Sequence, residues 1–176
     1  CVNVFPIESF IDEVARKMNK DPLQFRLGLL ATMPERKEEN LQQNPKRIAG
    51  VLQLAAEKIG YGKTLPANHY IGLASHHFTF AKAYAAHAIE IEMLEPKKFR
   101  IVKVVAAIDC GIVINPDGLK IQMEGGIAFA LSQALKGEIT VKDSRVVQDS
   151  FFNYEPLRFH EMPPVEVHYI NSNEEP

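Results

Sequence analysis

The sequence predicts an α+β fold in which a helical N-terminal third is followed by a mixed, largely antiparallel sheet packed by a helix. Up to residue 60, apolar residues recur every three or four positions, which is the spacing of amphipathic helices. Beyond residue 60 the period falls to two, and strand-like segments surround one further helical stretch. We therefore expect a helical entry segment at residues 1–60 and an α+β part at residues 61–176.

The composition excludes some classes of protein. Of the 176 residues, 46% are hydrophobic and 24% are charged, and the net charge is -2, as in ordinary globular chains. No basic excess is present to neutralise a phosphate backbone, so nucleic-acid binding is not expected. The longest apolar runs, such as residues 104–108, are too short to cross a bilayer. Either the cytoplasm or the periplasm fits this composition.

Three helices are expected in the N-terminal third. The first carries a single apolar stripe, with Asp12 and Glu13 on the solvent side; its members are Ile7, Phe10, Ile11, Val14, Ala15 and Met18. The second helix should run from residue 23 to about residue 30, after an Asp-Pro start. The third should start at Asn44 and end near Gly60. The polar residues 31–44 between them are expected to form a linker or mobile loop.

The remaining elements follow from alternation and from turn residues. Glu90 and Glu92 alternate with apolar residues, so residues 87–94 should pair antiparallel with the β-branched run 101–108. The alanine-rich residues 80–87 are assigned to the same strand, although their composition alone would suit a helix. We also expect a helix from Asn115 to Leu135, packed on that sheet. Strands are expected at 138–141, 146–148 and 165–169.

Cysteine and histidine give little support to catalysis or metal binding. Cys110 ends a predicted buried strand, where it could be a nucleophile of a cysteine hydrolase; a small apolar side chain at the sheet edge is the preferred interpretation. His76 and His77 are adjacent, so on a strand they would point to opposite faces. None of the six histidines lies four residues from another in a helix, and no protein metal site is expected.

Gln122, Gly125 and Gly126 are the candidate binding residues. A glutamine side chain offers both amide donors and a carbonyl acceptor, so it suits the polar edge of a cofactor. Each glycine costs about 1 kcal/mol in a helix interior relative to alanine, which suggests that another group approaches the backbone closely. That group could be a ligand or a packed neighbouring element, and the residues alone leave both interpretations open.

Several motifs occur in an order that resembles a known family. The segments are 8–13 with 21–26, 107–111 with 115–117, 122–127 with 131–135, 152–154, and 163–168. They resemble the second half of the molybdenum-binding large subunit in the xanthine dehydrogenase and aldehyde oxidase family, and are similar to isoquinoline 1-oxidoreductase β subunits. This resemblance covers nearly the whole chain and implies a molybdopterin-binding domain.

The resemblance implies an oxidoreductase of the molybdenum hydroxylase type. Members oxidatively hydroxylate an aldehyde or an N-heterocycle, using molybdenum on a molybdopterin cofactor that in bacteria is commonly the cytosine dinucleotide. Their partners are the rest of the large subunit and a small 2Fe–2S iron–sulfur subunit, which takes the electrons. Gln122 matches the family's cofactor-adjacent glutamine, and Gly125 and Gly126 follow it.

The chain also departs from the family's pattern. The base glutamate of the family lies in a GxGE motif after the strand equivalent to residues 165–170, and Glu174 has no flanking glycines, so no catalytic residue is assigned. Ala130 stands where relatives usually have glycine. With no initiator methionine and no terminal helix, we expect a fragment. We expect it to be inactive alone, because it lacks the family's base and the preceding half of the subunit, which supplies much of the pocket. The alternative is a free-standing structural or interaction module derived from this domain.

Overall fold

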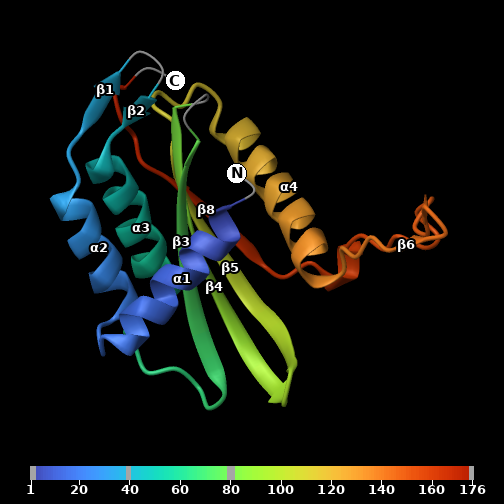
Figure 1. The fold of residues 1–176 in the computed structure, drawn as a ribbon. Coiled ribbons are helices and arrows are strands. Elements are labelled where there is room, and N and C mark those ends of the chain that lie inside the picture. Colours follow the sequence, from blue (N-terminus) through green and yellow to red (C-terminus); the bar gives the residue numbers. More distant parts are fainter. Residues whose placement is uncertain (1–2, 39–40, 79–81, 175–176) are drawn as a thin grey trace. The chain divides into compact units, whose positions relative to one another are not determined.

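The computed structural model describes residues 3–38, 41–78 and 82–174. It divides into two compact units, which are described separately (Figure 1). Unit 1 comprises Cys1–Ile114 and Pro164–Pro176, and unit 2 comprises Asn115–Pro163. The predicted division at residue 60 concerns domain organisation and stays a prediction. No helix among the described residues is long and apolar enough to cross a membrane.

Unit 1 contains a four-stranded sheet in the order β3-β4-β5-β8. The strands are β3 (His69–Phe78), β4 (Ala83–Glu95), β5 (Lys98–Asp109) and β8 (Val165–Tyr169). Neighbours pair antiparallel, except that β8 runs parallel to β5. This confirms the predicted antiparallel pairing of 87–94 with 101–108, and the last strand has the predicted bounds. The sequence patterns did not identify β3, and residues 80–81 of the predicted lead-in lie outside the described residues.

Helix α3 (Pro45–Ile59) covers one face of this sheet and forms the core of unit 1 with it (Figure 1). Asn44 caps its start by accepting hydrogen bonds from two backbone N–H groups, and Gly60 ends it in the left-handed conformation (φ 82°). Small residues on the sheet let the helix approach closely. The buried cluster consists of Ile48, Val51, Leu52, Ala55, Ala56, Ile59, Leu73, Tyr84, Ala86, Ala88, Val105 and Ala107. The α+β class is therefore confirmed.

The predicted buried face of the first helix was only partly right: Ala15 is fully buried, but Ile7, Phe10 and Met18 are exposed. Helix α1 (Val4–Lys17) turns its acidic side inward, toward α2 (Pro22–Thr32), and leaves much of its apolar stripe exposed. The cause is Arg26 on α2, which is only 3% exposed and draws Asp12 and Glu8 to itself. A buried guanidinium needs charged partners, and this requirement outweighs the burial of an amphipathic stripe.

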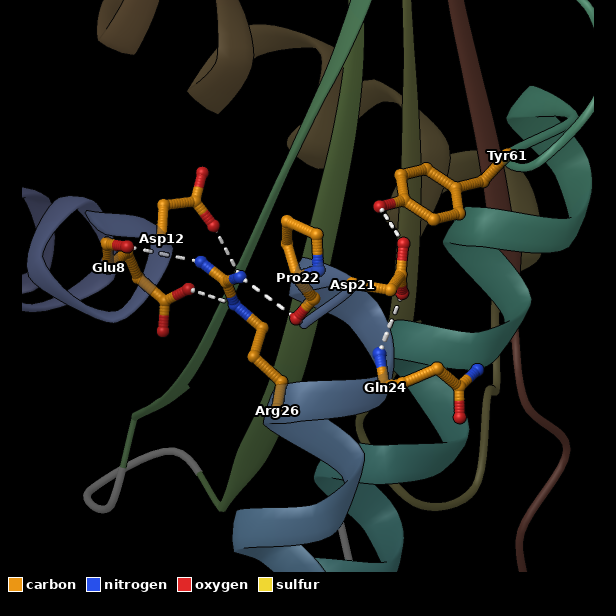
Figure 2. A network of polar contacts seen from close by, with 7 residues as sticks. All are labelled: Glu8, Asp12, Asp21, Pro22, Gln24, Arg26 and Tyr61. Carbon is orange, nitrogen blue, oxygen red and sulfur yellow. Dashed lines mark hydrogen bonds and ion pairs between the residues drawn. The ribbon is translucent and has the colours of Figure 1, made fainter. Parts of the chain in front are cut away.

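Figure 2 shows the guanidinium of Arg26 between the two carboxylates of α1. Its Nε donates to Glu8 Oε2 at 3.0 Å and its Nη1 donates to Asp12 Oδ1 at 2.5 Å. The backbone carbonyls of Glu8 and Pro22 accept two further hydrogen bonds at 3.1 Å and 3.2 Å. At the start of α2, Asp21 caps the N–H of Gln24 and accepts a hydrogen bond from the Tyr61 hydroxyl. The contacts of Arg26 with Glu8 and Asp12 fix how α1 is rotated about its own axis.

The expected linker at residues 31–44 is also partly wrong. Helix α2 continues to Thr32, and two short antiparallel strands follow, β1 (Arg36–Glu38) and β2 (Leu41–Gln43). A high content of polar and charged residues favours loops, but it does not prevent the backbone from pairing in a short hairpin.

Unit 2 consists mainly of α4 (Pro116–Leu135), which starts at the predicted cap. The side chain of Asn115 accepts a hydrogen bond from the N–H of Gly118 at 3.0 Å. A hairpin of two-residue strands follows, β6 (Val141–Lys142) and β7 (Arg145–Val146), so the predicted strands at 138–141 and 146–148 are shorter than expected. A short 3₁₀ helix, η2 (Phe159–Glu161), ends the unit. The packing of residues 115–135 on the sheet stays a prediction.

Candidate functional site

The candidate binding residues share one exposed face of α4. Gln122, Gly125, Gly126 and Phe129 stand at positions i, i+3, i+4 and i+7, which places them on one side of a helix. All four residues are exposed, whereas Ile127 and Leu131 are buried on the other side. The helix therefore presents an amide side chain beside a flat glycine surface and an aromatic ring.

The two glycines have no neighbour that requires them. A Cβ atom added at Gly125 or at Gly126 would meet no atom of the described residues within 4 Å. Among the described residues of unit 2, the side chain of Gln122 likewise has no hydrogen-bond partner, and Ala130 is exposed on the same helix. Packing against another described element of unit 2 therefore does not account for the glycines. Space for an approaching group is present at both positions.

Helix α4 holds this face on a rigid element of unit 2. Its N-terminus is fixed by Asn115 and Pro116, and its C-terminal half is tied to the chain that follows the hairpin. There the Ser132 hydroxyl accepts a hydrogen bond from the N–H of Leu157 at 2.9 Å and donates to the carbonyl of Ala128. Lys136 forms an ion pair with Glu161 at 2.6 Å, which lowers the pKa of that carboxyl.

A second polar centre lies in unit 1, where β5 ends. The carboxylate of Asp109 is buried and accepts two hydrogen bonds from the guanidinium of Arg47, at 2.8 Å and 2.6 Å. The Ser172 hydroxyl and the N–H of Gly111 donate to the same carboxylate at 2.9 Å and 3.2 Å. Burial alone would raise the pKa of Asp109, but these four hydrogen bonds bring it below its ordinary value. Asp109 is thus ionised, and it holds Arg47 and Ser172 at the end of β5.

Cys110, which follows Asp109 in the sequence, does not have the environment of an activated nucleophile. Burial raises the pKa of its thiol, and the negative charge of Asp109 raises it further. A thiol of this kind carries less thiolate at neutral pH than a free cysteine does. The structure therefore favours the apolar interpretation of Cys110 over a cysteine hydrolase.

The histidines are distributed among separate contacts. His77 stacks on Tyr84 with ring centroids 4.3 Å apart, and the guanidinium of Arg47 lies over the Tyr84 ring at 4.4 Å from its centroid. His69 contacts Glu90 at 2.7 Å. Burial lowers the pKa of His87, so this imidazole is neutral at neutral pH. No group of three metal-ligating side chains occurs within the part of the chain that the structure describes.

Sequence reasoning missed the partners of these polar residues. Asp109 was noted only as part of a motif, and nothing in the local pattern identified Arg47 or Ser172, which are 62 and 63 positions away. Arg26 was likewise noted only as part of a motif, the segment 21–26. Its only sequence signal is a charged residue beside Leu23 and Leu27 on an otherwise apolar helix, which is a weak sign of a buried ion pair.

Comparisons with known proteins agree with the motif order. The chain is 31% identical over 97% of its length to a membrane-bound aldehyde dehydrogenase (pyrroloquinoline-quinone) of Gluconacetobacter polyoxogenes. It is 29% identical over 97% to the beta subunit of isoquinoline 1-oxidoreductase from Brevundimonas diminuta, and 27% identical over 99% to a nicotinate dehydrogenase subunit from Pseudomonas putida. The chain spans only 23%, 20% and 15% of these three proteins.

Solved structures and a family model complete the comparison. Quinoline 2-oxidoreductase from Pseudomonas putida 86 aligns with 51% of this chain and 12% of its own, at 27% identity and a TM-score of 0.47. The model of the molybdopterin cofactor-binding domain matches residues 11–163, which is most of the chain and includes all of α4. The chain therefore belongs to the molybdopterin cofactor-binding domain family, and its relatives are oxidoreductases.

Proposed function

We propose that the exposed face of α4 formed by Gln122, Gly125 and Gly126 contacts the molybdopterin cofactor of a molybdenum hydroxylase. The observation that carries this proposal is the open glycine surface beside an amide side chain that has no hydrogen-bond partner among the described residues of unit 2. The amide of Gln122 would donate to and accept from the polar edge of the pterin. Gly125 and Gly126 would admit the cofactor to the helix backbone.

The reaction that we propose is the oxidative hydroxylation of an N-heterocycle or an aldehyde. Two relatives are named for N-heterocycles, isoquinoline and nicotinate, and a third is named for aldehydes. The cofactor, when bound, supplies the metal at which such a substrate is oxidised; the cytosine dinucleotide form is the one proposed here. The residues of this chain hold and orient the cofactor, and none of them is proposed as a catalytic base.

We propose that this chain forms one part of the cofactor site and that other polypeptide of the large subunit forms the rest. It spans between 15% and 23% of its relatives, so most of their polypeptide has no counterpart in residues 1–176. We propose as partners the rest of a large subunit and a small 2Fe–2S subunit that receives the electrons. The 176-residue chain alone should neither retain molybdenum nor oxidise aldehydes or N-heterocycles.

Cofactor analysis of the intact large subunit tests this proposal. We expect about one molybdenum per polypeptide by elemental analysis, and a pterin after extraction. The name of the Gluconacetobacter relative assigns pyrroloquinoline quinone to that enzyme, so this quinone is the main alternative cofactor to test for. A purified, active subunit that contains this quinone and no molybdenum would contradict the proposal.

A second candidate is an interaction module without catalysis. It is favoured by the aromatic side chains of unit 2 that are almost fully exposed, Phe152 and Phe159. This candidate predicts an intact protein that forms a stable complex with a partner but contains neither molybdenum nor a quinone. The same cofactor analysis, combined with size-exclusion chromatography, separates the two candidates.

A further inference from the structure

The outer side of α1 is apolar although its inner side is charged. Ile7, Phe10 and Met18 are 55%, 65% and 52% exposed, and they lie on one stripe of the helix and its C-terminal cap. The inner side carries Glu8 and Asp12, which bind Arg26 (Figure 2). Together with Val14, the three exposed residues form a continuous surface, the outer stripe.

The helix cannot rotate to bury this stripe. Such a rotation would break the bonds from Arg26 to both carboxylates and to the carbonyl of Glu8. Arg26 is almost fully buried, so it would then be a charge without a partner, which is strongly unfavourable. The outer stripe is therefore presented outward by the ion pairs behind it. An apolar surface held outward in this way is typical of an interface.

The charges of α1 favour a protein partner over a lipid surface. Helices that lie on membranes are rich in lysine and arginine on their polar side. Here the charged residues are three acidic and two basic, namely Glu8, Asp12, Glu13, Arg16 and Lys17. The two basic residues are both in the last turn, where they compensate the helix dipole. This distribution gives no attraction to anionic lipid.

We propose that the outer stripe of α1 is an internal interface, covered by apolar polypeptide of the same large subunit that lies outside residues 1–176. The inference rests on the proposal that this domain works within a larger subunit. This chain aligns over nearly its whole length with three relatives but spans only 15% to 23% of their length. Each of these relatives is therefore at least four times as long as this chain.

Hydroxyl-radical footprinting with mass spectrometry tests the interface without any substitution. In the 176-residue chain, Phe10 and Met18 should be oxidised at rates close to those in the denatured chain, like the exposed Leu94 of β4. In the intact large subunit, both should be oxidised roughly tenfold more slowly than after denaturation, because oxidation follows exposure. Performed on the cofactor-free subunit, the measurement does not depend on the cofactor proposal.

Three results would overturn the proposal. Equal oxidation of Phe10 and Met18 in the intact and denatured subunits would show that nothing covers the stripe. Protection that is lost on dilution would assign the stripe to a second copy, and protection that needs anionic vesicles would assign it to a membrane. As a second variant, Phe10→Asp should lower the melting temperature of the intact large subunit, with an expected shift of several degrees. The same substitution should leave the melting temperature of the 176-residue chain unchanged, and so should the control Leu94→Asp, since Leu94 is also exposed.

Discussion

Arg47 and Asp109 join the first turn of α3 to the end of β5 through two parallel hydrogen bonds, at 2.8 Å and 2.6 Å. The two residues are 62 positions apart, and both side chains are largely buried. Because Asp109 also binds Ser172, the same carboxylate fixes the segment that leaves β8. A buried bidentate pair of this kind depends on geometry, so neither partner can be replaced by a residue of merely similar charge.

Asp109→Asn should destabilise the chain by about 3–5 kcal/mol at neutral pH, because it leaves Arg47 without its buried partner. The folded-state pKa of Asp109 lies below its unfolded value, so its contribution is complete above about pH 4. That contribution is lost as the pH falls through the folded pKa. Urea unfolding at several pH values measures it. The prediction would be contradicted if the wild-type chain and Asp109→Asn were equally stable at neutral pH. It would also be contradicted if the difference between their free energies of unfolding increased as the pH fell.

Arg26→Met should weaken the packing of α1 against α2. The substitution leaves the carboxylates of Glu8 and Asp12 without their cation, and the expected cost is about 3–5 kcal/mol. Amide hydrogen exchange in α1 should rise while that of α3 stays slow. Lys58→Met is the matched control, since Lys58 pairs with Glu57 at the surface, and it should cost less than about 1 kcal/mol. Equal effects of the two substitutions would argue against the buried pair.

Tyr61→Phe should remove a tyrosine whose titration is displaced to high pH. Burial, followed by the hydrogen bond to Asp21, raises the pKa of Tyr61 to about 12. The stability that follows from this shift is present below about pH 10 and is lost as the pH rises toward the folded value. Absorbance titration of tyrosinate should show the late step only in the wild-type chain. The expected loss of stability near neutral pH is about 1 kcal/mol.

Gly125→Ala and Gly126→Ala should separate folding from binding. Each alanine should stabilise the 176-residue chain by up to about 1 kcal/mol, because the added Cβ meets no described atom and alanine favours the helix. In the intact large subunit, the double variant should contain less molybdenum. Gly28→Ala in α2 is the control, since its added Cβ also meets nothing within 4 Å. It should raise stability and leave the molybdenum content unchanged.

The parts of the fold that local chemistry determines could be predicted from the sequence. Asn44 and Asn115 each precede a proline and start α3 and α4, and Gly60 ends α3 in a conformation that suits glycine. Alternation around Glu90 predicted the β4–β5 pairing. These signals operate within a few residues, so they can be recognised without tertiary structure.

The parts that depend on distant contacts could not be predicted in this way. The side of α1 that faces inward is decided by Arg26, a residue on another helix, whereas the periodicity of α1 itself placed Asp12 on the solvent side. The partners of Asp109 lie on α3 and beyond β8. At the candidate site, the sequence marked Gln122 and the two glycines, and the structure added that they share an exposed face with Phe129.

The most direct test of the central claim is the molybdenum content of the intact large subunit carrying Gln122→Leu, measured beside its turnover and melting temperature. Gln24→Leu is the matched control, because Gln24 is an exposed glutamine on a different helix, α2, and is not part of the proposed face. Removing one partner from a buried polar contact costs about 1–3 kcal/mol, so Gln122→Leu should reduce molybdenum content and turnover at an unchanged melting temperature. Gln24→Leu should change none of the three. Normal molybdenum content and turnover in Gln122→Leu would contradict the proposed role of this face in binding the cofactor.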